Sequence, residues 1–157
     1  MDFDYQILRL TKDFYSAYAD HNIYGELMLK ENRAYNCLLI DLYYDYFLCI
    51  PYRTDIRHKN AFKFRKSSRS RTHQSGLDYS KMVIVKNSEY LEAKDAIIDH
   101  DEFKETIENI TTIVNEANNY LQKYILHVSG KKTLSPEEYD RLFRYSSLQY
   151  FHNELGL

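Results

Sequence analysis

A run of cationic, hydroxyl and imidazole side chains directly follows an apolar segment of the chain. Residues 46–50 read YFLCI and Pro51 follows them; the next positions include Arg53, Thr54, Arg57, His58 and Lys59. RNA carries its own nucleophile, the ribose 2′-hydroxyl. A metal-free ribonuclease therefore needs a group that removes the 2′ proton, a group that protonates the leaving 5′ oxygen, and cations that stabilise charge on phosphorus. These residue types can supply all three.

Each of these side chains has a candidate role in such a reaction. His58 could perform either proton transfer, because imidazole titrates near neutral pH. Arg53 or Lys59 could stabilise the developing charge, and Thr54 could orient a phosphate oxygen through its hydroxyl or backbone N–H. The end of a strand is a rigid mount for such groups. The alternative is that His58 is an ordinary surface histidine, as most single histidines are.

The same residues open a strongly basic segment. Residues 52–73 contain eight Lys or Arg and one Asp, a balance of +7, whereas the whole chain sums to −2 and the other residues therefore to −9. Such segments commonly bind polyanions, because each cation that neutralises a phosphate releases condensed counterions. Aromatic rings between cations suit single-stranded RNA, whose bases can stack on them. We therefore assign RNA contacts to Tyr52, Arg57, Lys63, Arg65, Lys66, Arg69, Arg71 and Lys81. The alternative is a solvated, flexible loop.

Carboxylates and cysteines give a weaker signal. One charged group hints at a metal-dependent nuclease: Asp99, Asp101, Glu102 and Lys104. These acids stand at the start of an expected helix, where they interact favourably with the helix dipole, and we favour that explanation. Cys37 and Cys49 lie in apolar runs, which indicates buried free thiols, and no Cys or His pair has the spacing of zinc ligands. We expect neither a metal nor a cofactor.

Length and composition indicate one folded domain over residues 1–157. The chain is 44% hydrophobic and 28% charged, with only four Gly and two Pro, which argues against long disordered regions. No apolar run approaches the roughly 20 residues of a membrane span, and the N-terminus does not resemble a signal peptide. We therefore expect a cytoplasmic protein without a membrane partner.

Strand patterns dominate the first half of the chain. Strands are expected at residues 3–8, 35–40, 46–50, 61–64 and 79–85, with a short helix at 11–19. Residues 43–46 read as a tight connection that makes the second and third of these strands a hairpin. Pro51 is expected to end the third strand, because it has no amide hydrogen for the ladder. Residues 67–76 are turn-rich and polar, which favours a mobile loop.

Helix patterns dominate the second half. Apolar residues recur with alternating spacings of four and three from Phe103 to Val128, which predicts one long amphipathic helix. Gly130 is expected at its C-terminal end. Ser135 is expected to cap a last helix that has Pro136 at its first position. With the sheet mainly in residues 1–86 and helices mainly in 88–157, the sequence predicts an α+β fold with an antiparallel sheet and helices packed on it.

Three stretches of the sequence resemble a known family. They are NRAYNCLLID (32–41), YDYFLCIPYRTDIRHKNAFKF (44–64) and SGLDYSKMVIV (75–85). They resemble the type III toxin–antitoxin endoribonucleases, the family of ToxN, AbiQ and CptN, with most likeness to the CptN branch. The resemblance covers roughly residues 23–90, and the helical half agrees in character only.

This resemblance implies a strongly bent antiparallel sheet with helices, partly barrel-shaped and related to the Kid and MazF toxins. It implies metal-independent cleavage of cellular RNA that leaves a 2′,3′-cyclic phosphate and a 5′-hydroxyl. It also implies a repeat RNA antitoxin that the toxin processes into inhibitory pseudoknots, held in a closed protein–RNA assembly, and a role in phage defence.

The family's site residues carry over at a few positions. The family has a basic residue just before the first central strand, which Arg33 matches. It has hydroxyl and basic residues after the Pro that follows the next strand, which Arg53 and Thr54 match. Some relatives have a Thr-Ser pair and a Lys here, which this chain lacks. The general base is therefore open between His58, which we prefer, and Lys59.

Two other classes of function compete with a ribonuclease. The same cations and rings could serve a non-catalytic RNA-binding module. Alternatively, the acidic helices could form a protein-interaction surface, and the basic segment would then be incidental.

Overall fold

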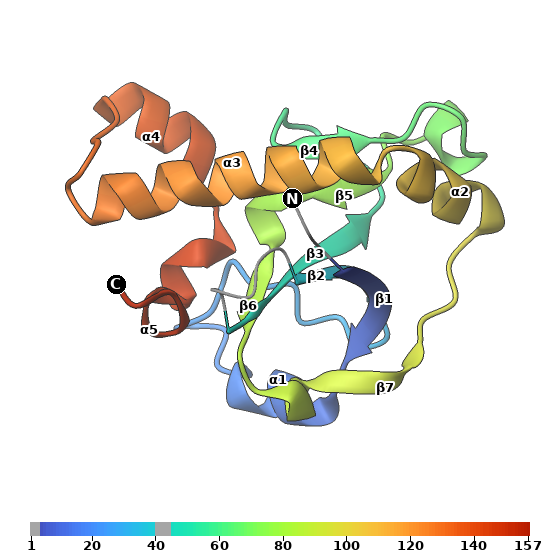
Figure 1. Cartoon of the computed structure of the whole chain (residues 1–157), viewed down its shortest axis with the longest axis horizontal. Coiled ribbons are helices and arrows are strands. Elements are labelled where there is room, and N and C mark those ends of the chain that lie inside the picture. The colour runs from blue at the N-terminus through green and yellow to red at the C-terminus, as the bar shows by residue number, and fades with distance from the viewer. Residues whose placement is uncertain (1–3, 40–44) are drawn as a thin grey trace.

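The protein folds as an antiparallel sheet flanked by helices, as the sequence predicted (Figure 1). The structure is a computed structural model that describes residues 4–39 and 45–157. Within these residues the strands are β1 (Asp4–Leu10), β2 (Ala34–Leu39), β3 (Phe47–Arg53), β4 (Ala61–Lys63), β5 (Gly76–Asp78), β6 (Val83–Val85) and β7 (Leu91–Asp95). The α-helices are α1 (Lys12–Ala17), α2 (His100–Glu108), α3 (Ile110–Val128), α4 (Pro136–Phe143) and α5 (His152–Leu155). Short 3-10 turns are η1 (Arg69–Arg71), η2 (Tyr79–Lys81), η3 (Ser88–Tyr90) and η4 (Ser147–Tyr150).

The central strand of the sheet is β3. The strand order is β4-β5-β3-β2-β1-β7, with every pairing antiparallel, and β6 pairs with β3 off this path. One side of β3 pairs with β2, and its other side pairs with β6 at residues 47–49 and with β5 at residues 52–53. The strands β4 and β7 are the edges, so the described sheet is open rather than closed into a barrel.

The expectation that Pro51 ends its strand is wrong, because β3 continues to Arg53. Pro51 pairs with Tyr35 of β2. On its other side it falls between the residues that pair with β6 and those that pair with β5. A proline is tolerated where a ladder is interrupted. The extension carries Tyr52 and Arg53 into the sheet.

Other strand expectations are confirmed with corrections. Residues 79–85 were expected to be one strand, but η2 precedes the short β6, because the Asp78 carboxylate accepts the Ser80 N–H and caps the turn. The strand β7 lies in the half expected to be helical. Its sequence LEAKD is charged and mostly exposed, as suits an edge strand, so it lacks an alternating pattern. Cys37 and Cys49 are buried and free and lie opposite each other on β2 and β3. Residues 43 and 44 of the expected connection at 43–46 lie outside the described residues.

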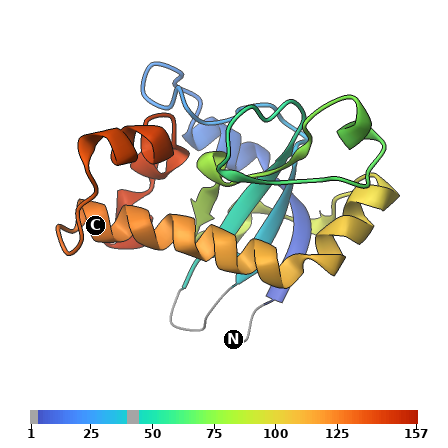
Figure 2. The same ribbon diagram turned by 90° about the horizontal axis from the view of Figure 1, so that it is seen from above.

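The helix α3 crosses the strands, with α2 at one of its ends and α4 and α5 near the other, whereas α1 lies beyond the strands from α3 (Figure 2). The expected long helix is divided into α2 and α3 at Asn109, whose side-chain amide donates to the Glu105 carbonyl and competes with the helix ladder. Gly130 follows α3 with a φ of +76°, and the Ser135 hydroxyl accepts the Glu138 N–H at the start of α4, as expected. Beyond α4 the expected last helix breaks into η4 and α5.

The core lies between the sheet and α3. Buried α3 side chains from Ile113 to Tyr124 join a single cluster with the apolar residues of β1, β2, β3 and β6. The Tyr52 hydroxyl bonds to that of Thr106 at 3.0 Å and links β3 to α2. The end of β3 therefore has a fixed position relative to the start of the helical layer. Within the described chain, no helix combines the length and the apolar character needed to cross a membrane.

Gly76 is required by the close approach of β4 and β5. A Cβ atom at this position would overlap the carbonyl oxygen of Phe62 and lie 2.9 Å from the Cα atom of Lys63, both of them backbone atoms of β4. Gly76 also pairs with Arg53 of β3. Any larger residue must therefore push β4 away from the strand end that carries Arg53.

We predict that Gly76→Ala lowers the free energy of unfolding by about 1–3 kcal/mol or more, because overpacking against backbone cannot relax easily. Urea unfolding of wild type and variant measures the difference. Gly25→Ala is the control, since its Cβ would lie 3.2 Å from the His21 carbonyl oxygen at an exposed site. We expect that variant to change stability by only about 0.5 kcal/mol. Equal effects of the two substitutions would contradict the packing explanation.

Candidate functional site: an arginine-lined cleft

A cleft of about 460 Å³ lies where the segment before β2, the end of β3 and the start of α2 meet. It is lined by Met28, Lys30, Glu31, Asn32, Arg33, Ala34, Tyr52, Arg53, Thr54, Arg69, Ile97, Ile98, Asp99 and Glu102. Five residues predicted from the sequence to bind or cleave RNA therefore line this cleft. They are Arg33, Tyr52, Arg53, Thr54 and Arg69 of η1.

Arg33 is the arginine of the cleft that has no carboxylate partner among the described contacts. Its Nη1 atom donates to the Tyr52 carbonyl at 2.8 Å, and its Nε atom is buried without a hydrogen-bond partner in the described part of the chain. Burial lowers the pKa of the Arg33 guanidinium, and the nearby charges of Arg53 and Arg69 lower it further. An anion that entered the cleft would relieve this repulsion between cations.

Arg53 is held by the fully buried carboxylate of Asp78. Its Nη1 atom lies 2.6 Å from Asp78 Oδ2. The other carboxylate oxygen, Oδ1, accepts the Ser80 hydroxyl at 2.6 Å and the Ser80 N–H at 2.9 Å. Burial by itself raises the pKa of Asp78, but hydrogen bonds from His58, Ser80 and Arg53 outweigh it and hold this pKa below its ordinary value. Asp78 is therefore an ionised anchor for the end of β3.

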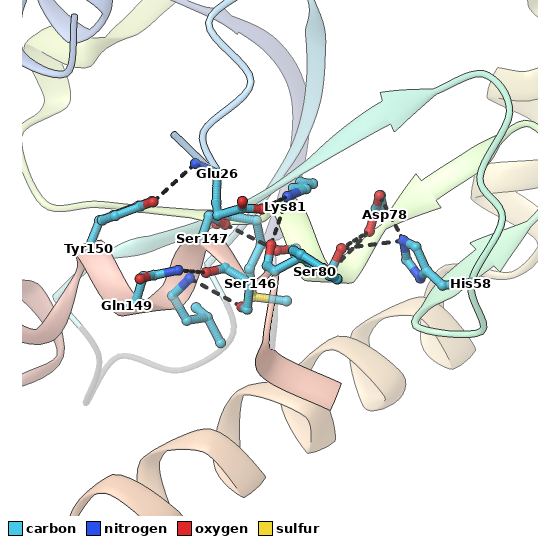
Figure 3. Close-up of polar contacts among 12 residues, drawn as sticks. Glu26, His58, Asp78, Ser80, Lys81, Ser146, Ser147, Gln149 and Tyr150 are labelled. Atoms are coloured by element: carbon cyan, nitrogen blue, oxygen red, sulfur yellow. Dashed lines mark hydrogen bonds and ion pairs between the residues drawn. The ribbon is translucent and has the colours of Figure 1, made fainter. Parts of the chain in front are cut away.

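His58 belongs to this anchor rather than to the cleft wall. Its Nε2 atom lies 3.1 Å from Asp78 Oδ2 and 3.3 Å from the Ser80 hydroxyl (Figure 3), and its Nδ1 atom accepts the N–H of Asn60 at 3.1 Å. Both ring nitrogens are engaged, in the pattern of a neutral ring that carries its proton on Nε2. Neither His58 nor the exposed Lys59 is among the described residues that line the cleft.

Carboxylates of α2 hold the backbone of the basic segment. Glu105 accepts the N–H groups of Arg65 and Lys66 at 2.8 and 3.0 Å, and Asp101 accepts that of Ser68 at 2.6 Å. Glu102 binds the side chain of Arg69. The acids do stand at the helix start, as expected, but their carboxylates bind the loop rather than merely facing the dipole. Among the described residues no group of three or more His, Cys, Asp or Glu is arranged to hold a metal ion.

The remaining residues assigned to RNA have different surroundings. Arg57 and Arg71 line a second hollow of about 290 Å³, whose lining includes Asp55 and Ser70, the chain neighbours of Thr54 and Arg69. Arg65 and Lys66 are exposed, and Lys63 donates to Gln74 at 2.9 Å. These cations surround one loop, and the α2 carboxylates hold the backbone of its first residues.

Two of the assigned residues are committed elsewhere. The Tyr52 ring is buried and stacked on Phe64 with centroids 6.1 Å apart, so it does not offer a free face to a base. The Lys81 ammonium lies 2.9 Å from Glu26 (Figure 3). It also lies 2.7 Å from the Tyr145 carbonyl, so it ties the segment before β2 to the residues that follow α4.

Several cleft residues escaped sequence reasoning. Asn32 has a φ of +69°, which places a left-handed turn between Lys30 and Arg33 and brings that segment to the cleft. The cluster of Lys30, Glu31 and Arg33 before a buried strand was the available signal. Ile97 lines the cleft although it is 88% exposed, and no local pattern around Ala96, Ile97 and Ile98 marked it for this place.

Comparison with models of known protein families, with curated proteins and with solved structures finds no match to this chain. The likeness to type III toxins therefore rests on the motifs of residues 23–90.

We predict that Asp78→Asn lowers the free energy of unfolding by about 2–4 kcal/mol at pH 7, because the change leaves Arg53 without its anionic partner. Since the folded pKa of Asp78 lies below the unfolded value of about 3.9, this stabilisation exists above pH 4 and is lost as pH falls through the folded pKa. The gap between wild type and variant in urea unfolding should therefore narrow below about pH 4.

Asp140→Asn is the control for this measurement. Its carboxylate is 60% exposed and lies 3.8 Å from Arg144, so it should change stability little at any pH. A gap between wild type and Asp78→Asn that stays constant down to pH 2 would contradict the ionised anchor.

Proposed function

We propose that this protein is an endoribonuclease toxin of the type III class, with its site in the arginine-lined cleft. The observation that carries the proposal is the convergence of Arg33, Arg53, Arg69 and Thr54 on one cleft. These residues come from three separate segments, and guanidinium forks and a hydroxyl match the oxygens of a phosphodiester. The sequence motifs that resemble this toxin class include Arg33, Arg53 and Thr54, and so support the same site.

The reaction requires little from the protein beyond charge stabilisation. The 2′-hydroxyl of the substrate attacks the adjacent phosphorus, its proton leaves to water in the open cleft, and the bond to the 5′ oxygen breaks. The 5′ oxygen takes a proton from water, which leaves a 2′,3′-cyclic phosphate and a 5′-hydroxyl. Arg33 and Arg53 stabilise the charge that builds on the phosphoryl oxygens. No metal ion is needed for any of these steps.

His58 supports the site through Asp78 in this proposal. The sequence nominated it for proton transfer, with Lys59 as the alternative. To act on a substrate, its Nε2 atom would have to give up its hydrogen bond to Asp78 and form one to the 2′-hydroxyl. Its observed contacts instead hold the carboxylate that orients Arg53.

The partners and fold relationships of the proposal follow from the resemblance. The inhibitor is a repeat-derived RNA pseudoknot in a closed protein–RNA assembly, and the toxin processes this RNA as well as cutting cellular RNA in the cytoplasm during phage defence. The exposed cations around Arg57, Arg65 and Arg71 are suited to the RNA backbone. The resemblance also implies that this sheet, which changes partner along β3, is related to the bent sheet of the Kid and MazF toxins.

A non-catalytic RNA-binding module is the second candidate. It is favoured by one observation: among the described residues, no histidine lines the cleft to transfer a proton. This candidate shares the cleft and its cations but predicts intact RNA after incubation.

We predict that Arg33→Ala reduces RNA cleavage by about 10²–10³-fold, the usual effect of removing one charge-stabilising donor. Arg33→Lys should be milder, although an ammonium does not reproduce the fork. Cleavage of a labelled single-stranded RNA by purified protein measures both. Arg144→Ala removes the same charge at an exposed site on the end of α4 and serves as control. Equal rates for Arg33→Ala and Arg144→Ala would place the chemistry elsewhere.

For His58 the two roles predict different outcomes. If it braces Asp78, His58→Gln should keep most activity, because the Gln amide can donate to the carboxylate as Nε2 does. His58→Ala should lose about 10-fold or more. If His58 transfers protons, both variants should lose the factor of about 10²–10⁴ that is typical of general acid–base groups. Rates of the two variants under saturating RNA distinguish these roles.

A further inference from the structure

The guanidinium of Arg69 is held on two sides. Its Nε and Nη2 atoms donate to the two carboxylate oxygens of Glu102 at 2.9 and 2.6 Å, and its Nη1 atom donates to the Thr54 hydroxyl at 2.9 Å. The Glu102 side chain is only 1% exposed, whereas that of Arg69 is 39% exposed and lines the cleft. A buried carboxylate thus grips a guanidinium that faces the open site.

This geometry leaves Arg69 able to bind an anion. A guanidinium has five N–H hydrogens, and three of them are used in the contacts above, so one on Nη1 and one on Nη2 remain within the described structure. The Thr54 hydroxyl accepts from Arg69, so its own hydrogen can point toward a ligand. The hydrogen bonds that Arg69 donates to Glu102 raise the pKa of Arg69 and keep it charged beside Arg33 and Arg53.

Attachment of the basic segment to α2 does not explain the Glu102 contact. Two other acids of α2 already bind the backbone of this segment: Glu105 accepts the N–H groups of residues 65 and 66, and Asp101 accepts that of residue 68. Glu102 contributes something different, because it orients a side chain rather than the backbone. A carboxylate that fixes an arginine fork supports the group that contacts the ligand, as outer groups around metal ligands do.

We propose that Glu102 is a positioning residue that aims Arg69 at the reacting phosphate, where Arg69 and Thr54 together bind one phosphoryl oxygen. Arg69 thereby becomes a third charge-stabilising group of the reaction, rather than one of the peripheral RNA contacts. The inference rests on the proposed function, because the phosphate in question is that of the cleaved RNA. Arg69 keeps its protons throughout, and no proton moves along the chain from Glu102 to Thr54.

The test compares two substitutions on α2, each of which replaces a charged carboxylate with a neutral amide of the same shape. Glu102→Gln faces Arg69 with an amide that can satisfy only one of its two N–H groups. Glu108→Gln removes the same charge at a partly exposed site outside the described cleft lining, 3.8 Å from Lys66. Loss of a negative charge should strengthen RNA binding modestly in both variants. We expect kcat to fall about 10²-fold in Glu102→Gln alone, because a misplacement of the Arg69 guanidinium by about 1 Å has an effect of that size. The KM of this variant should be unchanged or lower.

Two further proteins show whether Glu102 acts through Arg69. If it does, Arg69→Ala and the double variant Arg69→Ala/Glu102→Gln should cleave RNA equally slowly. The double variant also removes the unpaired guanidinium, so the comparison remains usable if Glu102→Gln alone folds poorly.

The outcomes separate this inference from the proposed function. Wild-type protein that cuts RNA, with equal kcat in Glu102→Gln and Glu108→Gln, overturns the positioning role alone. The positioning role is also overturned if the double variant cleaves RNA at least tenfold more slowly than Arg69→Ala. Wild-type protein that cuts no RNA overturns the positioning role together with the proposed function.

Discussion

The contact between the start of α2 and the basic segment is the interaction on which the cleft depends. The basic segment brings Arg69 close to Arg33, which also lies near Arg53, and these charges would repel one another without compensation. Asp101, Glu102 and Glu105 supply that compensation with short hydrogen bonds to the backbone of the segment and to the side chain of Arg69. The acidic helix thus keeps a cationic loop folded over the end of β3 in the absence of a polyanion.

The cleft arginines divide by their partners. A buried carboxylate holds each of two, Asp78 for Arg53 and Glu102 for Arg69, whereas a backbone carbonyl holds Arg33. The paired arginines are fixed in direction and remain charged, and Arg33 leaves positive charge in the cleft without an ionic partner among the described residues. Such an arrangement is prepared for an anion, because rigid donors need little rearrangement when charge develops.

Sequence reasoning succeeded where the signal was local. Strand patterns, the Ser135 cap, the glycine after α3 and the gathering of Arg33, Arg53 and Thr54 all follow from periodicity, from turn chemistry or from family motifs. It failed where a contact joins segments far apart in the chain. The pairing of Arg69 with Glu102 spans 33 residues, and that of His58 with Asp78 spans 20. No local pattern shows that a helix-start acid grips a loop, or that a histidine faces inward.

The ends of RNA cut by the purified protein test the central claim most directly. A single-stranded RNA should be incubated with the protein in excess chelator, and its fragments analysed by mass spectrometry. A cleft that acts through arginine charge and the substrate's own 2′-hydroxyl predicts fragments with 2′,3′-cyclic phosphate and 5′-hydroxyl ends, formed without added metal. Intact RNA, or fragments with 3′-hydroxyl and 5′-phosphate ends that form only with magnesium, would contradict it.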